Sequence, residues 1–333
     1  MAAWTFKKWL FWILFLTALL AVAAGVAVTL GAVWIPLGKS GSVLLHSLMG
    51  RGGAPEGLDR EAAILMELRV PRVVSGALVG AALALCGAVL QALLRNPLAD
   101  PYVLGISSGA ALGGYAVPAA AFSGALLTLL FVYFLARVQG RVPAQTMLLA
   151  GFIVSAFFLA IIMFLISWTS DERLFQVTFW LMGNLEYMAS KPLAGIFLYL
   201  LVGSAVLFSR AKDLNLAALG EETASELGVE VERLKKITFV SASLITGAVV
   251  SVSGLIGFVG LVVPHLVRMI WGPDHRFLLP GSALAGAILL VLADTIARTI
   301  LAPSEVPVGV ITALGGAPFF VYLLRRKGLA GNP

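Results

Sequence analysis

The sequence has few charged residues for its length. Charged side chains make up 12% of the 333 residues, and hydrophobic side chains make up 60%. A soluble domain carries roughly 25% charged and 45–50% apolar residues. This composition excludes an ordinary soluble globular protein and indicates a protein embedded in a lipid bilayer.

Cysteine and histidine are also scarce. Cys86 is the single cysteine, which excludes an internal disulfide and a cysteine-based metal cluster, and we interpret it as a small buried residue. The histidines at His46, His265 and His275 are dispersed and lack metal-binding spacing. We therefore predict no metal site, and a hydrogen-bonded structural role for His265 after Pro264.

A complete nucleotide-binding motif is missing. The segment 38–40 (GKS) looks like the end of a P-loop, but that pattern requires glycine at position 33, where Val33 stands. The segment also follows no predicted strand. We predict that this chain binds no cofactor, and that ATP-Mg, where it is used, is held by another chain.

Long uncharged runs are what the sequence does contain, the first from Trp9 to Gly38. One helix needs ~20 apolar residues to cross ~30 Å of hydrocarbon. Only helices and closed barrels satisfy their backbone groups in lipid, and these runs lack the alternation of barrel strands. We predict an all-α membrane protein with ten spans, centred near residues 22, 81, 110, 127, 155, 200, 246, 264, 288 and 315.

The basic residues predict the orientation. An even number of spans puts both termini on one side, which then holds 15 of the 23 Lys and Arg residues. The positive-inside rule places that side, and both termini, in the cytoplasm. The first uncharged run spans 30 residues, whereas a signal peptide has an apolar core of about 7–15. We therefore predict an uncleaved first span, and read the net charge of +6 as a topology signal rather than nucleic-acid binding.

We predict one transmembrane domain over residues 1–333 with two hydrophilic loops. The loop 39–68 is expected in the periplasm, irregular through its glycines at 50–53, with a short interfacial helix at 59–67. The loop 210–236 is expected in the cytoplasm.

The cytoplasmic loop contains one patterned segment between two glycines. Glu221 and Glu222 begin it, where acids complement the positive end of a helix dipole. Leu219, Ala224 and Leu227 would give this short charged helix an apolar edge. The residues alone leave two interpretations open, a docking helix for a soluble partner and a solvated surface loop.

A weak internal repeat relates two spans. The Gly-Ala pair at 80–81 is followed by Gly87, and the pair at 247–248 by Gly254 at the same interval. The predicted topology runs these spans in opposite directions, which is typical of inverted-topology repeats in transporters. Close helix packing through small residues explains the same pattern, so both explanations stay open.

Charged residues near the span ends need a reason, since burying them is costly. Asp294 and Arg298 are four residues apart, as in a helix-surface pair. Arg69 and Arg72 begin the second span on the same predicted outer side. The three arginines predict a cationic surface, which either docks an acidic protein partner or anchors the helices at the lipid interface.

Eight segments, in order from about residue 65 to 325, carry a family resemblance. They are LRVPR at 68–72, GAVLQALLRNPLADPYVLGISSGAALG at 87–113, LLAG at 148–151, GEETASELGV at 220–229, GLIGFVGLVVPHLVR at 254–268, DHRFLLPGSALAGA at 274–287, LADTIAR at 292–298 and VPVGVITALGGAPFF at 306–320. With them the chain resembles the FecCD family, the iron-chelate, haem and vitamin B12 permeases of ABC importers. The stretches 39–68 and 171–200 match poorly.

The resemblance implies a permease subunit, not an enzyme, in the bacterial inner membrane. It implies ten helices with inverted repeats, a homodimer, two copies of an ABC ATPase subunit and a periplasmic substrate-binding protein. The cargo it implies is an iron chelate, which we take to be a ferric siderophore because such systems are numerous in the family. Vitamin B12 and haem remain alternatives.

Family roles transfer to matching positions. Binding-protein docking is assigned by resemblance to Arg69, Arg72 and Arg298. ATPase coupling is assigned to Gly220, Glu221, Glu222, Ala224, Leu227 and Gly228. A cytoplasmic gate is assigned to Asn96 and Leu98, and with a poor local match to Gln145 and Thr146.

Two other function classes compete with this interpretation. An ion-coupled secondary transporter would need ionisable residues at mid-membrane depth, but Asp294 and Arg268 lie toward predicted span ends. A membrane enzyme would use His265 or His275 with a carboxylate, and no nucleophile–base spacing supports it.

Overall fold

The structure is a computed structural model. It describes residues 5–31, 33–49, 57–102, 118–138, 142–167, 178–185 and 193–330. Helices dominate these parts of the chain, as the apolar runs predict.

The described residues form a series of helices in chain order. Their bounds are α1 Phe6–Thr29, α2 Leu37–Leu48, α3 Asp59–Ala63, the π-helix η1 Ile64–Arg69, α4 Val70–Leu93, α6 Pro118–Ala136, α7 Ala144–Ser167, α10 Leu193–Ser209, α11 Ala211–Ala217, α12 Glu221–Glu226, α13 Val231–Ser253, α14 Val259–Trp271, α15 His275–Thr299 and α16 Val308–Ala330.

Five helices are long and apolar enough to cross a membrane. They are Phe6–Thr29, Asp59–Leu93, Ala144–Ser167, Val231–Ser253 and His275–Thr299. Shorter apolar helices cover Phe122–Ala136, Phe197–Ser209, Val259–Trp271 and Val308–Tyr322. Nine of the ten predicted span centres thus fall in apolar helices. The centre near residue 110 lies outside the described residues, so ten spans remain a prediction.

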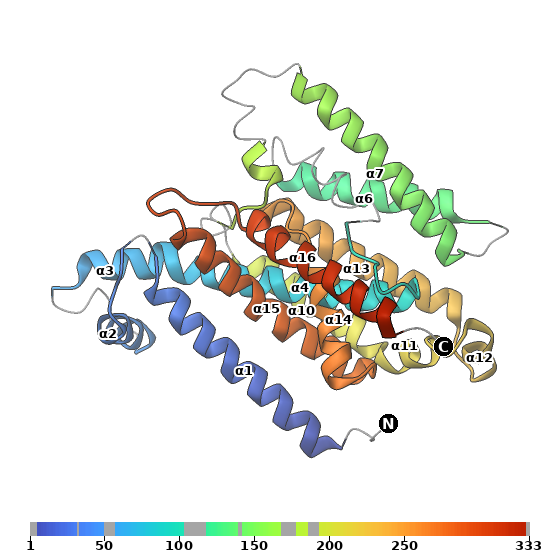
Figure 1. Cartoon of the computed structure of the whole chain (residues 1–333), viewed down its shortest axis with the longest axis horizontal. Helices are drawn as coiled ribbons and strands as arrows, with labels where there is room; N and C mark the ends of the chain where they lie inside the picture. Colours follow the sequence, from blue (N-terminus) through green and yellow to red (C-terminus); the bar gives the residue numbers. More distant parts are fainter. Residues whose placement is uncertain are drawn as a thin grey trace.

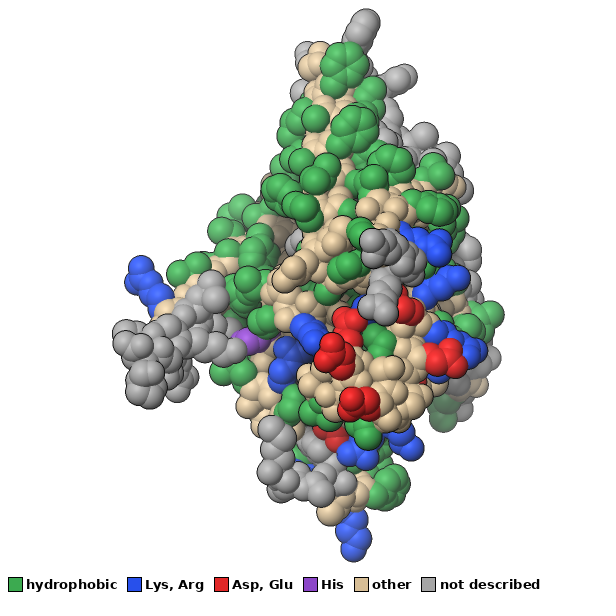
Figure 2. All heavy atoms as spheres, turned by 90° about the vertical axis from the view of Figure 1, so that its right-hand side faces the viewer, with side chains coloured by type: hydrophobic (Ala, Val, Ile, Leu, Met, Phe, Trp, Pro, Cys, Tyr) green, Lys and Arg blue, Asp and Glu red, His purple; other side chains and the backbone are tan. Residues whose placement is uncertain are grey.

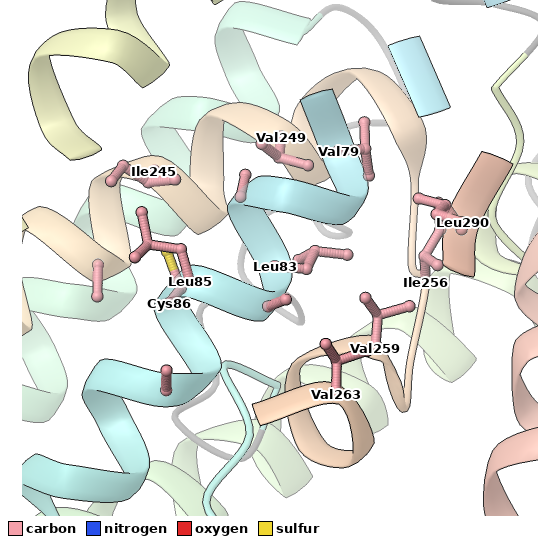
Figure 3. Packing of buried hydrophobic residues seen from close by; sticks show 14 of the residues in the cluster. Val79, Leu83, Leu85, Cys86, Ile245, Val249, Ile256, Val259, Val263 and Leu290 are labelled. Atoms are coloured by element: carbon pink, nitrogen blue, oxygen red, sulfur yellow. The ribbon is translucent and has the colours of Figure 1, made fainter. Parts of the chain in front are cut away.

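Helix α4 lies at the centre of the bundle, with α13, α14 and α15 packed around it (Figure 1). Figure 3 shows side chains of α4 meeting those of its neighbours in the core, with Cys86 on the side of Ile245. Cys86 is buried, as predicted. By contrast, α7 packs mainly on α6 and stands apart from the bundle (Figure 1).

Glycine lets α4 approach two neighbours backbone to backbone. A Cβ atom added at Gly80 would overlap the carbonyl oxygen of Gly286 on α15, and one at Gly87 would overlap that of Gly260 on α14. Small residues at helix contacts permit this close approach. The packing role proposed for these glycines is therefore confirmed for α4. The repeat partner Gly254 differs, because it ends α13 with φ 67°.

The bundle has two opposite ends that carry its polar groups. We call one the arginine end, where α1 and α15 finish and η1 meets α4. The other is the α12 end, where α4 finishes and α11, α12 and the start of α13 lie (Figure 1). The expected short helix at 59–67 is present as α3 and η1, and it continues into α4. Residues 37–48 form the helix α2, which was not predicted within the loop 39–68, and the glycines at 50–53 that predict its irregular part lie outside the described residues.

Candidate functional site

At the arginine end, Arg72 lies between two carboxylates from the distant C-terminal part of the chain. Its Nε donates to Asp294 Oδ1 at 3.0 Å and Oδ2 at 3.2 Å. Its Nη1 donates to Glu305 Oε2 at 2.7 Å. Asp294 is buried, whereas the Glu305 side chain is 38% exposed at the rim. One carboxylate of this group is therefore inside the protein and the other is accessible to solvent.

Arg298 completes the pairing around Asp294. Its Nε lies 2.9 Å from Asp294 Oδ2, so the predicted i, i+4 pair is confirmed. Its Nη2 also donates to Ala27 O at 3.1 Å, near the end of α1. The last carbonyls of a helix lack partners within it and carry partial negative charge. The guanidinium thus binds a carboxylate and a helix end together.

Arg69 also bonds carbonyls at the same end of α1. Its Nη1 donates to Val28 O at 2.8 Å and to Thr29 O at 2.9 Å, and its Nη2 donates to Val33 O. A Cβ atom at Gly31 would clash with this guanidinium. Arg69 is the last residue of η1, and π-turns of this kind often occur at functional positions.

The three arginines do not form the predicted cationic surface. Arg69, Arg72 and Arg298 are only 5–8% exposed, and the Asp294–Arg298 pair is buried rather than on a helix surface. A buried charge must be paired and hydrogen-bonded, because desolvation is costly. Three cations against two carboxylates leave the cluster, which we call the arginine cluster, with one excess positive charge. A docking role for it stays a prediction.

At the α12 end, the patterned segment forms a short helix, as predicted. Glu221 and Glu222 begin α12, and the residues before and after it, Gly220 and Gly228, have φ 140° and 84°. Such positive φ values favour glycine. The segment protrudes at this end of the molecule (Figure 1).

The predicted apolar edge of α12 is only partly present. Leu219 and Leu227 are 68% and 57% exposed, whereas Ala224 is fully buried beneath them. Figure 2 shows acidic and basic side chains gathered on this face of the molecule. The surface therefore offers two exposed leucines within a charged surrounding, which is suited to contact with another protein.

Behind α12 lies a buried lysine that the sequence did not single out. Lys235 on α13 is 8% exposed. Its Nζ lies 2.7 Å from Glu221 Oε2 and 3.0 Å from Glu232 Oε1, and it donates to Val142 O at 3.4 Å. Glu232 Oε2 in turn accepts a bond from Val142 N at 3.3 Å. We call these groups the lysine cluster.

Helix α11 connects this end to the start of α15. Asn215 Nδ2 donates to Asp274 Oδ1 at 2.8 Å, and Asn215 Oδ1 accepts from His275 N at 2.8 Å. Asp274 also caps α15 by accepting from Arg276 N. Burial raises the pKa of Asp274, but the bonds from Arg276 and Asn215 outweigh it and lower that pKa to about 2.

The predicted gate residues lie at this same end. Asn96 Oδ1 accepts from Leu98 N at 2.9 Å in the turn after α4, and Leu98 is 45% exposed. Gln145 and Thr146 lie in the first turn of α7, exposed and half-buried respectively. Their role as a gate stays a prediction.

A second polar contact, also missed by the sequence reasoning, joins α4 to α14. Arg268 Nη1 donates to Gln91 Oε1 at 3.1 Å, and Gln91 Nε2 donates to Leu261 O at 3.1 Å. Gln91 carries no charge and lies inside an apolar run, so no sequence signal marked it.

The P-loop-like segment and His265, which the sequence analysis considered, take part in ion pairing and packing. The P-loop-like segment 38–40 lies within α2, where Lys39 pairs with Glu61 at 2.8 Å. His265 is buried, with its ring edge-on to Phe320. Among the described residues, no group of three His, Cys, Asp or Glu side chains is placed to hold a metal ion.

Known proteins resemble the chain over nearly its whole length. The model of the FecCD transport family matches residues 16–326. The cobalamin import permease BtuC of Halobacterium salinarum is 44% identical over 92% of this chain and 86% of its own. The hemin transport permease HmuU of Yersinia pestis is 42% identical over 79% and 84%.

A solved structure has the same architecture. It describes an inward-facing conformation of an ABC transporter of the metal-chelate type, with a TM-score of 0.78 and 31% identity over 95% of this chain and 99% of that chain. These relatives exclude the secondary transporter and the membrane enzyme as classes for this protein. The chain belongs to the FecCD transport family and is a transport permease subunit of an ABC importer, not an enzyme.

Proposed function

We propose that this permease carries a bulky metal chelate inward across the bacterial inner membrane. The family match over residues 16–326 carries the proposal, because it includes both polar ends of the bundle. We propose ten spans in one transmembrane domain over residues 1–333, with both termini, the α12 end and the loop 210–236 in the cytoplasm. The arginine end and the loop 39–68 then face the periplasm.

The partners follow from the family, which implies an ATPase and a binding protein. We propose that two permease chains form a homodimer with the path along their shared axis. Two ATPase subunits bind the cytoplasmic face and hold ATP-Mg, while this chain binds no cofactor. A periplasmic binding protein covers the outer face and supplies specificity for the cargo.

The arginine cluster is the proposed docking site for the binding protein. Its excess positive charge attracts carboxylates of a partner, and the rim carboxylate of Glu305, which is bonded to Arg72, marks the place where a partner carboxylate would bind. Charge-assisted bonds to arginine are directional and strong. Carboxylates of the binding protein would thus meet Arg72 first, while Asp294, paired with both Arg72 and Arg298, holds Arg72 from inside.

Helix α12 is the proposed contact for the ATPase. The exposed leucines Leu219 and Leu227 fit a cleft in that partner, and the buried Ala224 fixes the helix to this chain. ATP binding and hydrolysis move the ATPase pair, and α12 moves with it. A partner shifts a conformational equilibrium only through its different affinity for the two states. The predicted gate at Asn96, Leu98, Gln145 and Thr146 would then open and close in turn.

The proposal also concerns the identity of the transported chelate. Ferric siderophores, haem and cobalamin are all metals held in large organic ligands, and we predicted a ferric siderophore. The two named relatives, for cobalamin and for hemin, favour a macrocyclic chelate instead. The cobalamin permease has the higher identity of the two, so cobalamin is our first candidate and a ferric siderophore is the alternative.

One reconstitution tests the function. The permease, with its cognate ATPase and binding protein, is placed in liposomes and offered radiolabelled cyanocobalamin, hemin and a ferric hydroxamate siderophore. We expect uptake of one of them that requires ATP, and no ATP hydrolysis by the purified permease alone. Uptake driven by an ion gradient without ATP would overturn the proposal.

A further inference from the structure

The lysine cluster joins three elements that are separate in the sequence. Glu221 belongs to α12, Lys235 and Glu232 to the first turns of α13, and Val142 to the segment just before α7. The Nζ of Lys235 lies within 3.4 Å of an oxygen from each of them. A single buried ammonium group thus holds the proposed ATPase contact, the helix behind it and the base of α7 together.

A second bond connects the same region to α4. Arg95 Nη2, just after α4, donates to Ala217 O at the end of α11 at 2.9 Å. The chain then runs through Leu219 and Gly220 into α12. The end of α4, which carries two predicted gate residues, is therefore bonded to α11 directly, and the start of α7, which carries the other two, is connected to α12 through Lys235 of α13.

We propose that Lys235 is a positioning residue that transmits movement of α12 to the base of α7. The inference rests on the proposed function, in which α12 is the ATPase contact. Two carboxylates satisfy the buried ammonium, and losing one leaves a buried charge poorly paired. Displacing α12 without α7 would separate Glu221 from Lys235, or Lys235 from Val142. The elements therefore move as one, and α7 follows the ATPase.

The arrangement distinguishes Lys235 from its neighbours. Lys236 is the next residue and the same type, but its side chain is exposed. Arg233 is also exposed and pairs with Glu230 at 3.5 Å, both on the same turn. Only Lys235, among the basic residues of this turn, reaches across elements.

The first test measures coupling in the reconstituted importer. We expect Lys235→Met to lower the number of cargo molecules transported per ATP by about tenfold, in the usual range of coupling between sites, with assembly and ATP hydrolysis retained. Lys235→Arg keeps the charge and should restore much of the ratio. Lys236→Met is the matched control and should leave it unchanged. A normal ratio in Lys235→Met would overturn the proposal.

The second test needs neither cargo nor ATPase. Amide hydrogen exchange of the full-length permease in lipid nanodiscs should become faster in Lys235→Met at residues 142–149 and 220–229. Residues 6–29 should be unchanged, because the bonds that define the lysine cluster join α12, α13 and Val142 and do not include α1. Faster exchange throughout the chain would mean a general loss of stability and would overturn a transmitting role, as would no change at all.

The two failures can be told apart. If the wild-type complex transports none of the three probes with ATP, the proposed function fails, while the exchange experiment still tests the connection. If the wild type transports and Lys235→Met transports equally well per ATP, the connection fails and the function stands.

Discussion

The arginine cluster and the lysine cluster both compensate the cost of burying positive charge, but their charge balance is opposite. At the arginine end, Arg72 and Arg298 pair with two carboxylates, while Arg69 and Arg298 donate to backbone carbonyls at or just beyond the end of α1. At the α12 end, one buried cation has two partly exposed carboxylates, with side-chain exposures of 42% and 44%. The first cluster has an excess of positive charge and the second an excess of negative charge.

This difference indicates that the arginine cluster is a fixed structure, whereas the lysine cluster is adaptable. The arginine cluster ties α1, α4 and α15 together deep in the protein, and its inner carboxylate has no access to water. The carboxylates of the lysine cluster regain water whenever their bonds break. We therefore expect the arginine cluster to determine stability, and the lysine cluster to determine how movement passes between elements.

The largest effect should come from removing the inner carboxylate of the arginine cluster. Asp294→Asn removes the carboxylate paired with buried Arg298 and leaves buried Arg72 paired with the rim carboxylate of Glu305 alone. Loss of one partner from a buried ion pair costs about 3–5 kcal/mol. Thermal unfolding in detergent should show a clear drop in midpoint, whereas Asp213→Asn, at an exposed pair with Arg210, should leave it unchanged. Equal midpoints would show that the buried pairing contributes little.

A smaller effect is expected at the cap of α15, near the α12 end. Asp274→Ala removes the N-cap and the bond to Asn215, which should cost about 1 kcal/mol. The folded pKa of about 2 lies below the usual 3.8, so this contribution is present above the usual pKa and is lost as pH falls through 2. The difference in stability between wild type and variant should be constant from pH 7 to about pH 4.5 and then shrink. A difference that instead grows below pH 4 would contradict this sign.

The lysine cluster should affect stability even less. Lys235→Met frees two carboxylates that are already partly hydrated, so unfolding should change by about 1 kcal/mol or less, as for exposed pairs. The loss of unfolding free energy in Lys235→Met is compared with the loss in Asp294→Asn under the same conditions. If the two variants lost equal stability, the contrast between a fixed and an adaptable cluster would be wrong.

The smallest effect concerns the rim of the arginine cluster. Glu305→Gln removes a carboxylate that competes with those of the binding protein for Arg72. The affinity of docking should therefore rise about two- to fivefold, which corresponds to the free energy of an exposed ion pair. The gain should fall with added salt. Glu67→Gln, an exposed acid of η1 at the same end, changes the net charge equally and is the control. Weaker docking of Glu305→Gln would mean that Glu305 itself contacts the partner.

The sequence predicted what depends on neighbours along the chain. The apolar runs located nine helices, and the glutamates after Gly220 marked the start of α12. The spacing of Asp294 and Arg298 predicted their ion pair. These features follow from helix geometry and composition, which act over a few residues.

What the sequence could not show is pairing between distant elements. Arg69 binds carbonyls about 40 residues away, and Lys235 binds Val142 across 93 positions. Backbone carbonyls carry no side-chain signal, and Glu305 looks like an ordinary loop acid until α4 and α15 pack together. The arginines were therefore expected at the surface, although they are inside.

The glycine contacts of α4 have a mechanical consequence. Where Gly80 meets Gly286 and Gly87 meets Gly260, main chain touches main chain with no side chains between them. These backbone contacts contain no side chain that could change its rotamer. We therefore expect α4, α14 and α15 to move as one rigid body. Any hinge among the described helices then lies outside that body, and α7, which packs mainly on α6 and is bonded to the lysine cluster through Val142, can move relative to it when α12 moves.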